Sequence, residues 1–137
     1  MPAPPSDRKI LQAIYDRYYA AFASFSQEGP SRSSKIYVPV DLNALCNHFG
    51  VDVDIIFGRL YYYLNHKFGY TQSDGSKVYL FTPKAGADPN CVNMPLLASV
   101  LAGMREEHRK DLWALWIAIA SLALSIASFV VSVSLKQ

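Results

Sequence analysis

Cysteine is scarce in this chain of 137 residues, which contains only Cys46 and Cys91. Two isolated thiols make no disulfide framework, and the opening residues MPAPPSDRK lack the apolar segment of a secretory signal. We therefore expect a reducing, cytosolic setting. The sequence also has no nucleophile elbow, phosphate-binding glycine loop or paired-carboxylate motif, and the spacing of its three histidines fits no metal site. The prediction is a protein that is not an enzyme and has no cofactor.

An excess of positive charge is also missing. The formal net charge is +2, and residues 1–104 hold nine Lys and Arg side chains against eight Asp and Glu. A domain that binds nucleic acid mainly through phosphates needs a clustered basic surface. The charge balance therefore gives no strong indication of a nucleic-acid partner.

Charge is absent altogether from residues 112–135, LWALWIAIASLALSIASFVVSVSL. A helix of 24 residues is about 36 Å long, enough to cross a hydrocarbon core of about 30 Å. Trp113 and Trp116 stand at one end, where indole rings favour the membrane interface, and Lys136 stands at the other. The sequence predicts one transmembrane helix over 112–135.

The charges that flank this run predict its orientation. Arg105, Arg109 and Lys110 precede it, whereas Lys136 alone follows it. Positive charges stay on the cytoplasmic side, so we expect a cytoplasmic N-terminal domain and a C-terminus on the opposite side. This is the arrangement of a tail-anchored, single-pass membrane protein.

Small side chains recur along the predicted span at separations of 4, 3, 4, 3 and 4 residues, a heptad rhythm that keeps one face toward a partner helix. Ala and Ser let helix backbones approach closely. We call this set the small-residue seam and expect it to form homo-oligomers, although ten of the 24 residues are Ala or Ser and composition alone is the alternative. Its members are Ala114, Ala118, Ser121, Ser125, Ser128 and Ser132.

The N-terminal part predicts helices capped by Ser6, Asp41 and Asp52. The first helix keeps an apolar face from Ile10 to Phe25 and ends at Gly29-Pro30, and the second, LNALCNHF, ends at Gly50. In the third helix we expect the buried positions to be Ile56, Leu60, Tyr63 or Leu64, and the stem of Lys67. Between the first two, KIYVPV predicts a strand at a sheet edge, because Pro39 cannot donate a backbone hydrogen bond. YTQSDGSKVYLF predicts a hairpin that turns at Asp74-Gly75.

This order, α-β-α-α-β-β, resembles the winged helix-turn-helix superfamily over residues 6–83, most specifically in LCNHFGVDVDIIFGRLYYYLNHKFGY. The resemblance implies an α+β domain over residues 1–83. Residues 84–95, KAGADPNCVNMP, predict a linker. Residues 96–111 predict a juxtamembrane amphipathic helix that packs on the domain, lies on the bilayer or continues a helical bundle upward from the span.

In a winged helix that reads DNA, the second helix of the motif enters the major groove. Here that helix exposes Asp54, Phe57, Tyr61 and Tyr62, and aspartates repel phosphates whereas exposed aromatic rings are typical of protein interfaces. We predict that these four residues bind a protein of unknown identity. For DNA, the less favoured partner, the candidate contacts are Arg59, Lys67, Lys77 and Lys84.

Three hypotheses follow from these patterns. The leading one is a tail-anchored adaptor or scaffold whose winged-helix domain binds a protein and whose span self-associates in the lipid bilayer. The second is a DNA-binding protein tethered to the membrane. The third is an oligomeric effector that disrupts the membrane.

Overall fold

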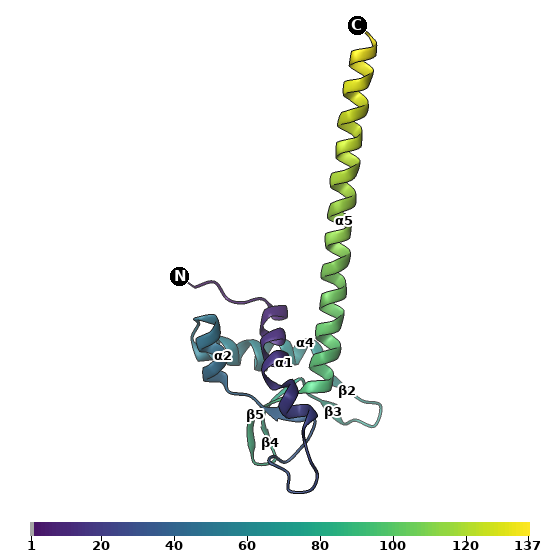
Figure 1. Cartoon of the computed structure of the whole chain (residues 1–137). Coiled ribbons are helices and arrows are strands. Elements are labelled where there is room, and N and C mark those ends of the chain that lie inside the picture. Colours follow the sequence, from purple (N-terminus) through teal and green to yellow (C-terminus); the bar gives the residue numbers. More distant parts are fainter. Residues whose placement is uncertain (1) are drawn as a thin grey trace. The chain divides into compact units, whose positions relative to one another are not determined.

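The computed structural model of the chain describes residues 2–137, which form an α+β protein with a long apolar C-terminal helix. The chain divides into two units, Met1–Ala102 and Gly103–Gln137. In the first unit, α1 (Asp7–Ala23), β1 (Tyr37–Pro39) and α2 (Leu42–Phe49) are followed by α3 (Val53–Gly58), the π-helical turn η1 (Arg59–Leu64) and α4 (Asn65–Phe68). The strands β2 (Tyr70–Thr71), β3 (Lys77–Val78), β4 (Phe81–Ala85) and β5 (Asp88–Asn93) come next, and α5 (Met94–Leu135) ends the chain (Figure 1).

The helix starts follow the predicted capping residues. Ser6 accepts a hydrogen bond from the Lys9 backbone N–H, and Asp41 and Asp52 cap α2 and α3 in the same way. Gly50, with φ of 66°, ends α2 in the left-handed conformation that glycine adopts without strain. The first helix, however, ends at Ala23, six residues before Gly29, so its predicted length was wrong.

The sheet departs from the sequence prediction. A three-stranded antiparallel sheet has the order β1-β5-β4, and β2 and β3 form a separate two-stranded hairpin at Asp74-Gly75. The predicted linker 84–95 was wrong, because β4 and β5 pair around Gly86 within it. Its prolines are compatible with strands: Pro83 lies on the edge strand β4, and Pro89 lies beyond the part of β5 that pairs with β1.

The core of the first unit gathers one apolar face from each element. Ile10, Leu11 and Ile14 of α1 are fully buried. Buried with them are Leu45 of α2 and three residues of the third helix, Ile56, Leu60 and Leu64. Of the two predicted alternatives, Leu64 is therefore the core residue, because Tyr63 is 48% exposed. The prediction that Lys67 is buried was wrong, because this residue is exposed. The first turns of α5 complete the core through Met94, Leu97 and Leu101.

The third helix of the domain is not a regular α-helix. Between α3 and α4 the chain widens into η1, where the backbone N–H of Asn65 donates to the carbonyl of Leu60, five residues earlier. Single π-helical turns are uncommon and often accompany functional sites. No pattern in the sequence predicted this turn.

Asn65 joins the end of this helix to the sheet. Its side-chain oxygen accepts hydrogen bonds from the backbone N–H groups of Leu80 at 2.9 Å and Phe81 at 3.2 Å, and both of those residues are buried. Gly69 permits the close packing around it, because a Cβ at this position would lie 2.5 Å from the Asn65 carbonyl oxygen and 3.1 Å from that of Val78. One amide therefore holds β4 against α4.

We predict that Asn65→Ala lowers the free energy of unfolding by about 2–5 kcal/mol, because it leaves two buried N–H groups without an acceptor. Urea unfolding in detergent, followed by near-ultraviolet circular dichroism, measures the change, and amide hydrogen exchange at Leu80 and Phe81 should accelerate. Asn65→Asp keeps an acceptor oxygen and is the matched control. Equal protection of these amides in wild type and Asn65→Ala would contradict the assigned role.

Candidate functional site

An aromatic cluster covers the surface where the third helix meets β4. Phe57 stacks on Tyr61 with ring centroids 5.3 Å apart and an interplanar angle of 16°. The Phe57 ring is nearly perpendicular to the buried ring of Phe81, with centroids 5.8 Å apart, and the rings of Tyr61 and Tyr62 lie edge to face with centroids 4.9 Å apart. Tyr61 is 38% exposed and Tyr62 is 73% exposed. We call Phe57, Tyr61, Tyr62 and Phe81 the aromatic face.

The sequence located part of this face. Phe57, Tyr61 and Tyr62 come together, and the exposed Asp54 lies one helical turn before Phe57. Phe57 is half-buried and packs on Phe81, so it supports the two tyrosines as well as contributing surface. Phe81 was missed as a site residue, because its position depends on a strand that the sequence had assigned partly to a linker.

Arg59 does not face outward as a free cation. Its guanidinium forms an ion pair with Asp7 and donates a 2.9 Å hydrogen bond to the Pro5 carbonyl. The same group lies 5.6 Å from the centroid of the Tyr63 ring. Arg59 therefore clamps the start of α1 to η1, and its donors are directed into the protein.

The other predicted cations are dispersed. Lys67 lies over the rings of Tyr63 and Phe68, with its ammonium nitrogen 5.7 Å and 5.3 Å from their centroids. Lys77 and Lys84 are exposed on β3 and β4. At the start of α3, where a DNA-reading helix would approach the bases, Asp52 and Asp54 are exposed instead. This arrangement offers little attraction for a DNA backbone.

The Cys91 thiol does not have the environment of a catalytic nucleophile. Cys91 is buried, and burial together with the nearby charge of Asp88 raises the pKa of its thiol. Cys46 is half-buried on α2, and both cysteines are free thiols. Across residues 2–137, no three His, Cys, Asp or Glu side chains gather as a metal site would require.

In the second unit, α5 carries an uninterrupted apolar surface. Every residue from Arg105 to Gln137 is exposed, including Leu124 and Phe129 at 70% each. The apolar stretch of this helix is long enough to cross a membrane, and none of it is buried within the protein. The six members of the small-residue seam all lie on it, and the Ser125 hydroxyl donates a 2.9 Å hydrogen bond to the Ser121 carbonyl within the helix.

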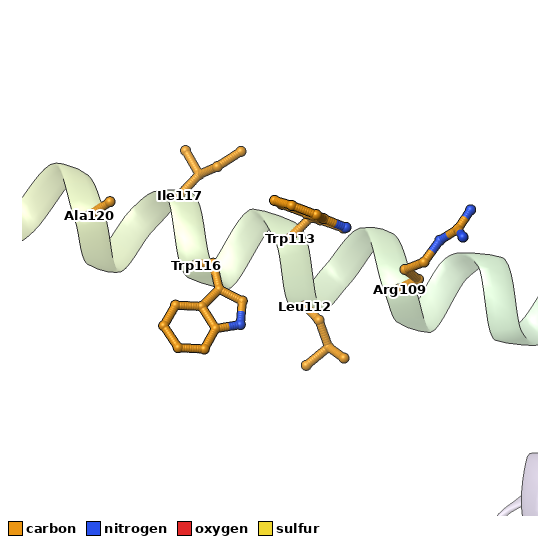
Figure 2. Close-up of a pocket in the computed structure, with 6 residues that line it drawn as sticks. All are labelled: Arg109, Leu112, Trp113, Trp116, Ile117 and Ala120. Carbon is orange, nitrogen blue, oxygen red and sulfur yellow. The ribbon is translucent and has the colours of Figure 1, made fainter.

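A hollow of about 740 Å³ lies at the beginning of this apolar stretch, bordered by Arg109, Trp113 and Trp116 among others. Figure 2 shows that the labelled side chains project from both sides of one helix, with Trp116 and Leu112 on one side and Ile117 and Trp113 on the other. The hollow is therefore space between neighbouring side chains of a single helix. Such open apolar space is suited to lipid chains or a second helix.

No protein-family model matches this chain, and no curated protein or solved structure is significantly similar to it. Function is therefore inferred from the aromatic face and from α5.

We predict that the protein sediments with membranes and resists extraction with alkaline carbonate. Replacing both Leu122 and Leu124 by Arg should shift most of it to the soluble fraction, because an arginine at the centre of a span costs about 2.5–3.5 kcal/mol. The double replacement by Ala is the matched control and should still sediment. A wild-type chain that remains a soluble monomer without detergent would exclude membrane insertion.

Proposed function

We propose that the protein is a non-enzymatic adaptor anchored in a membrane by α5, with a cytoplasmic domain that binds a protein partner through the aromatic face. The observation that carries this proposal is the exposure of Tyr61 and Tyr62 above the packed rings of Phe57 and Phe81. Tyrosines of this kind supply large contact areas at low entropic cost and are enriched in protein interfaces.

A winged-helix-like domain is part of this proposal. The order α1, β1, α2, α3 followed by the β4–β5 hairpin, with β5 paired to β1, supports it. In this assignment the wing is the β4–β5 hairpin around Gly86, and the short β2–β3 hairpin is an addition between helix and wing. Winged helices also serve as protein-binding modules, so the fold is compatible with an adaptor.

The orientation and oligomeric state are further parts of the proposal. Arg105, Arg109 and Lys110 precede the apolar stretch and favour a cytoplasmic location for the folded domain. The small-residue seam supports self-association of α5, because its side chains allow close approach and its serine hydroxyls can bond across the interface. An adaptor built in this way presents several copies of the aromatic face on one membrane.

Capture from solubilised membranes tests the protein partner. We expect a partner protein to copurify with wild type. The amount of this protein that is recovered should fall by about tenfold or more in the double variant Tyr61→Ala, Tyr62→Ala, because interface aromatic anchors contribute about 2 kcal/mol or more to binding. Tyr19→Ala is the control, since Tyr19 is 48% exposed on α1, away from the face. Nuclease treatment should leave the capture unchanged.

A membrane-tethered DNA-binding protein is the second candidate, favoured by the exposed ammonium groups of Lys77 and Lys84. It predicts the opposite result in the same experiment. Capture would then be lost after nuclease treatment and in the double variant Lys77→Glu, Lys84→Glu, and would survive replacement of the two tyrosines.

Self-association of α5 is tested by energy transfer between fluorescently labelled copies in lipid vesicles. We expect Ser125→Leu with Ser128→Leu to weaken association by about 1–2 kcal/mol, because leucine separates the two backbones. Ala120→Leu with Ala127→Leu makes the same kind of change away from the seam and should leave energy transfer unaltered. Equal energy transfer in both double variants would remove the seam from the proposal.

A further inference from the structure

Next to the aromatic face, the third helix and the strands enclose two adjoining hollows. The larger has a volume of about 530 Å³ and lies against β4, and the smaller, of about 170 Å³, lies against the β2–β3 hairpin. They share Asn65, His66 and Tyr79, so they form one continuous depression. We call it the tyrosine groove, and its exposed rings are Tyr61, Tyr62, Tyr70 and Tyr79.

The tyrosine groove combines exposed aromatic rings with few charged side chains. No Asp or Glu lines either hollow, whereas His66 and Lys77 do. Four tyrosines offer flat ring faces with hydroxyl groups at their ends. Grooves with aromatic walls and scattered hydrogen-bond donors bind proline-rich segments, whose rings lie on the aromatic faces and whose carbonyls remain available as acceptors.

The chain itself contains such a segment before α1. We call residues 2–6, Pro-Ala-Pro-Pro-Ser, the proline arm. Each proline holds φ near −65°, and Ala3 and Pro4 are restricted to extended ψ because a proline follows them. Ser6 has φ of −70° and ψ of 159°. The φ angles of the three prolines and the ψ angles of Ala3 and Pro4 are thus restricted to polyproline II values before the arm binds anything.

The arm is anchored at one end and exposed at the other. Pro5 is buried and its carbonyl accepts the hydrogen bond from Arg59, whereas residues 2–4 are exposed. Three residues extend at most about 10 Å. In Figure 1 the arm leaves α1 on the side of α2, whereas β2 and β3 lie on the other side of α1. In that view the free part of the arm is directed away from the β2–β3 side of the groove in its own copy.

We propose that the tyrosine groove binds the proline arm of a second copy of this chain. This inference rests on the proposed function, in which the surface around Tyr61 and Tyr62 binds protein and the copies associate. The groove supplies aromatic walls without carboxylates, and the arm is a preformed, uncharged ligand that loses little conformational entropy on binding. Copies held together by their spans meet at an effective concentration on the order of 1 mM, at which a dissociation constant of about 0.1 mM gives mostly occupied grooves.

Photocrosslinking between isotopically distinct copies tests this exchange. Unlabelled full-length protein carrying Tyr79→p-benzoylphenylalanine is mixed with ¹⁵N-labelled wild type in phosphatidylcholine vesicles and irradiated. Mass spectrometry should find position 79 of the unlabelled copy joined to the ¹⁵N-labelled tryptic peptide that ends at Arg8. Tyr79 is 42% exposed; Tyr19, 48% exposed and outside the groove, is the control position and should give no such product.

The proline content of the arm is tested in the labelled copy. Pro2→Ala with Pro4→Ala should lower the crosslinked fraction by about fivefold, because the unbound arm then samples more conformations. These residues are exposed, so the fold should be unaffected, which amide exchange at Leu80 verifies. An undiminished yield would show that polyproline II conformation is not what the groove recognises and would overturn the proposal.

Three other outcomes of these experiments would overturn the binding of the proline arm by a second copy. Joined peptides from the unlabelled copy alone would mean that each arm reaches its own groove, which overturns exchange between copies. A deoxythymidine oligonucleotide that becomes crosslinked at position 79 and displaces the arm would identify a nucleic-acid groove instead. If no arm is crosslinked while capture that depends on Tyr61 and Tyr62 persists, this inference fails and the proposed function stands; loss of that capture as well would remove both.

Discussion

Water is a poor solvent for the apolar surface of α5, and the proposed function depends on this constraint. From Leu112 to Leu135 the helix has no charged residue and no protein surface against its side chains. Burying one large apolar side chain is worth about 1.5–3 kcal/mol, so many such side chains left in water would carry a large penalty. A bilayer would remove that penalty, and in the proposed function the folded domain then acts on a surface instead of in a volume. Affinities that are weak in solution become useful when copies are confined in this way.

Within the domain, contacts distant in sequence decide what is presented to a partner. The guanidinium of Arg59 pairs with Asp7 and donates to the Pro5 carbonyl, so this cation stabilises the start of α1. The side-chain oxygen of Asn65 accepts hydrogen bonds from the backbone at the start of β4. The surface that remains is made of tyrosine rings, with charge reduced to a few dispersed groups. This division of roles is the physical basis for preferring a protein over DNA as the partner.

Local signals in the sequence predicted local structure well. The structure agrees with the caps at Ser6, Asp41 and Asp52, the helix end at Gly50, the edge position of Pro39 and the apolar stretch of α5, each of which follows from a few neighbouring residues. The linker prediction failed because Pro, Gly and Asn also occur in the β4–β5 hairpin, in which β5 pairs with β1, some fifty residues earlier. The positions of Tyr79 and Phe81 beside Tyr61 and Tyr62 were not predicted for the same reason, since they depend on contacts between the strands and the helix.

The widened turn η1 has a consequence for how this helix could change. A regular α-helix bonds each N–H to the carbonyl four residues earlier, whereas the bond from Asn65 to Leu60 spans five. The turn therefore accommodates one residue more than a regular helix would hold between these two positions. Deleting one of the three consecutive tyrosines would restore the four-residue bond and leave the direction of Asn65, and its hold on β4, nearly unchanged. The surplus residue thus adds aromatic surface to the helix without disturbing the amide that fastens it to the sheet.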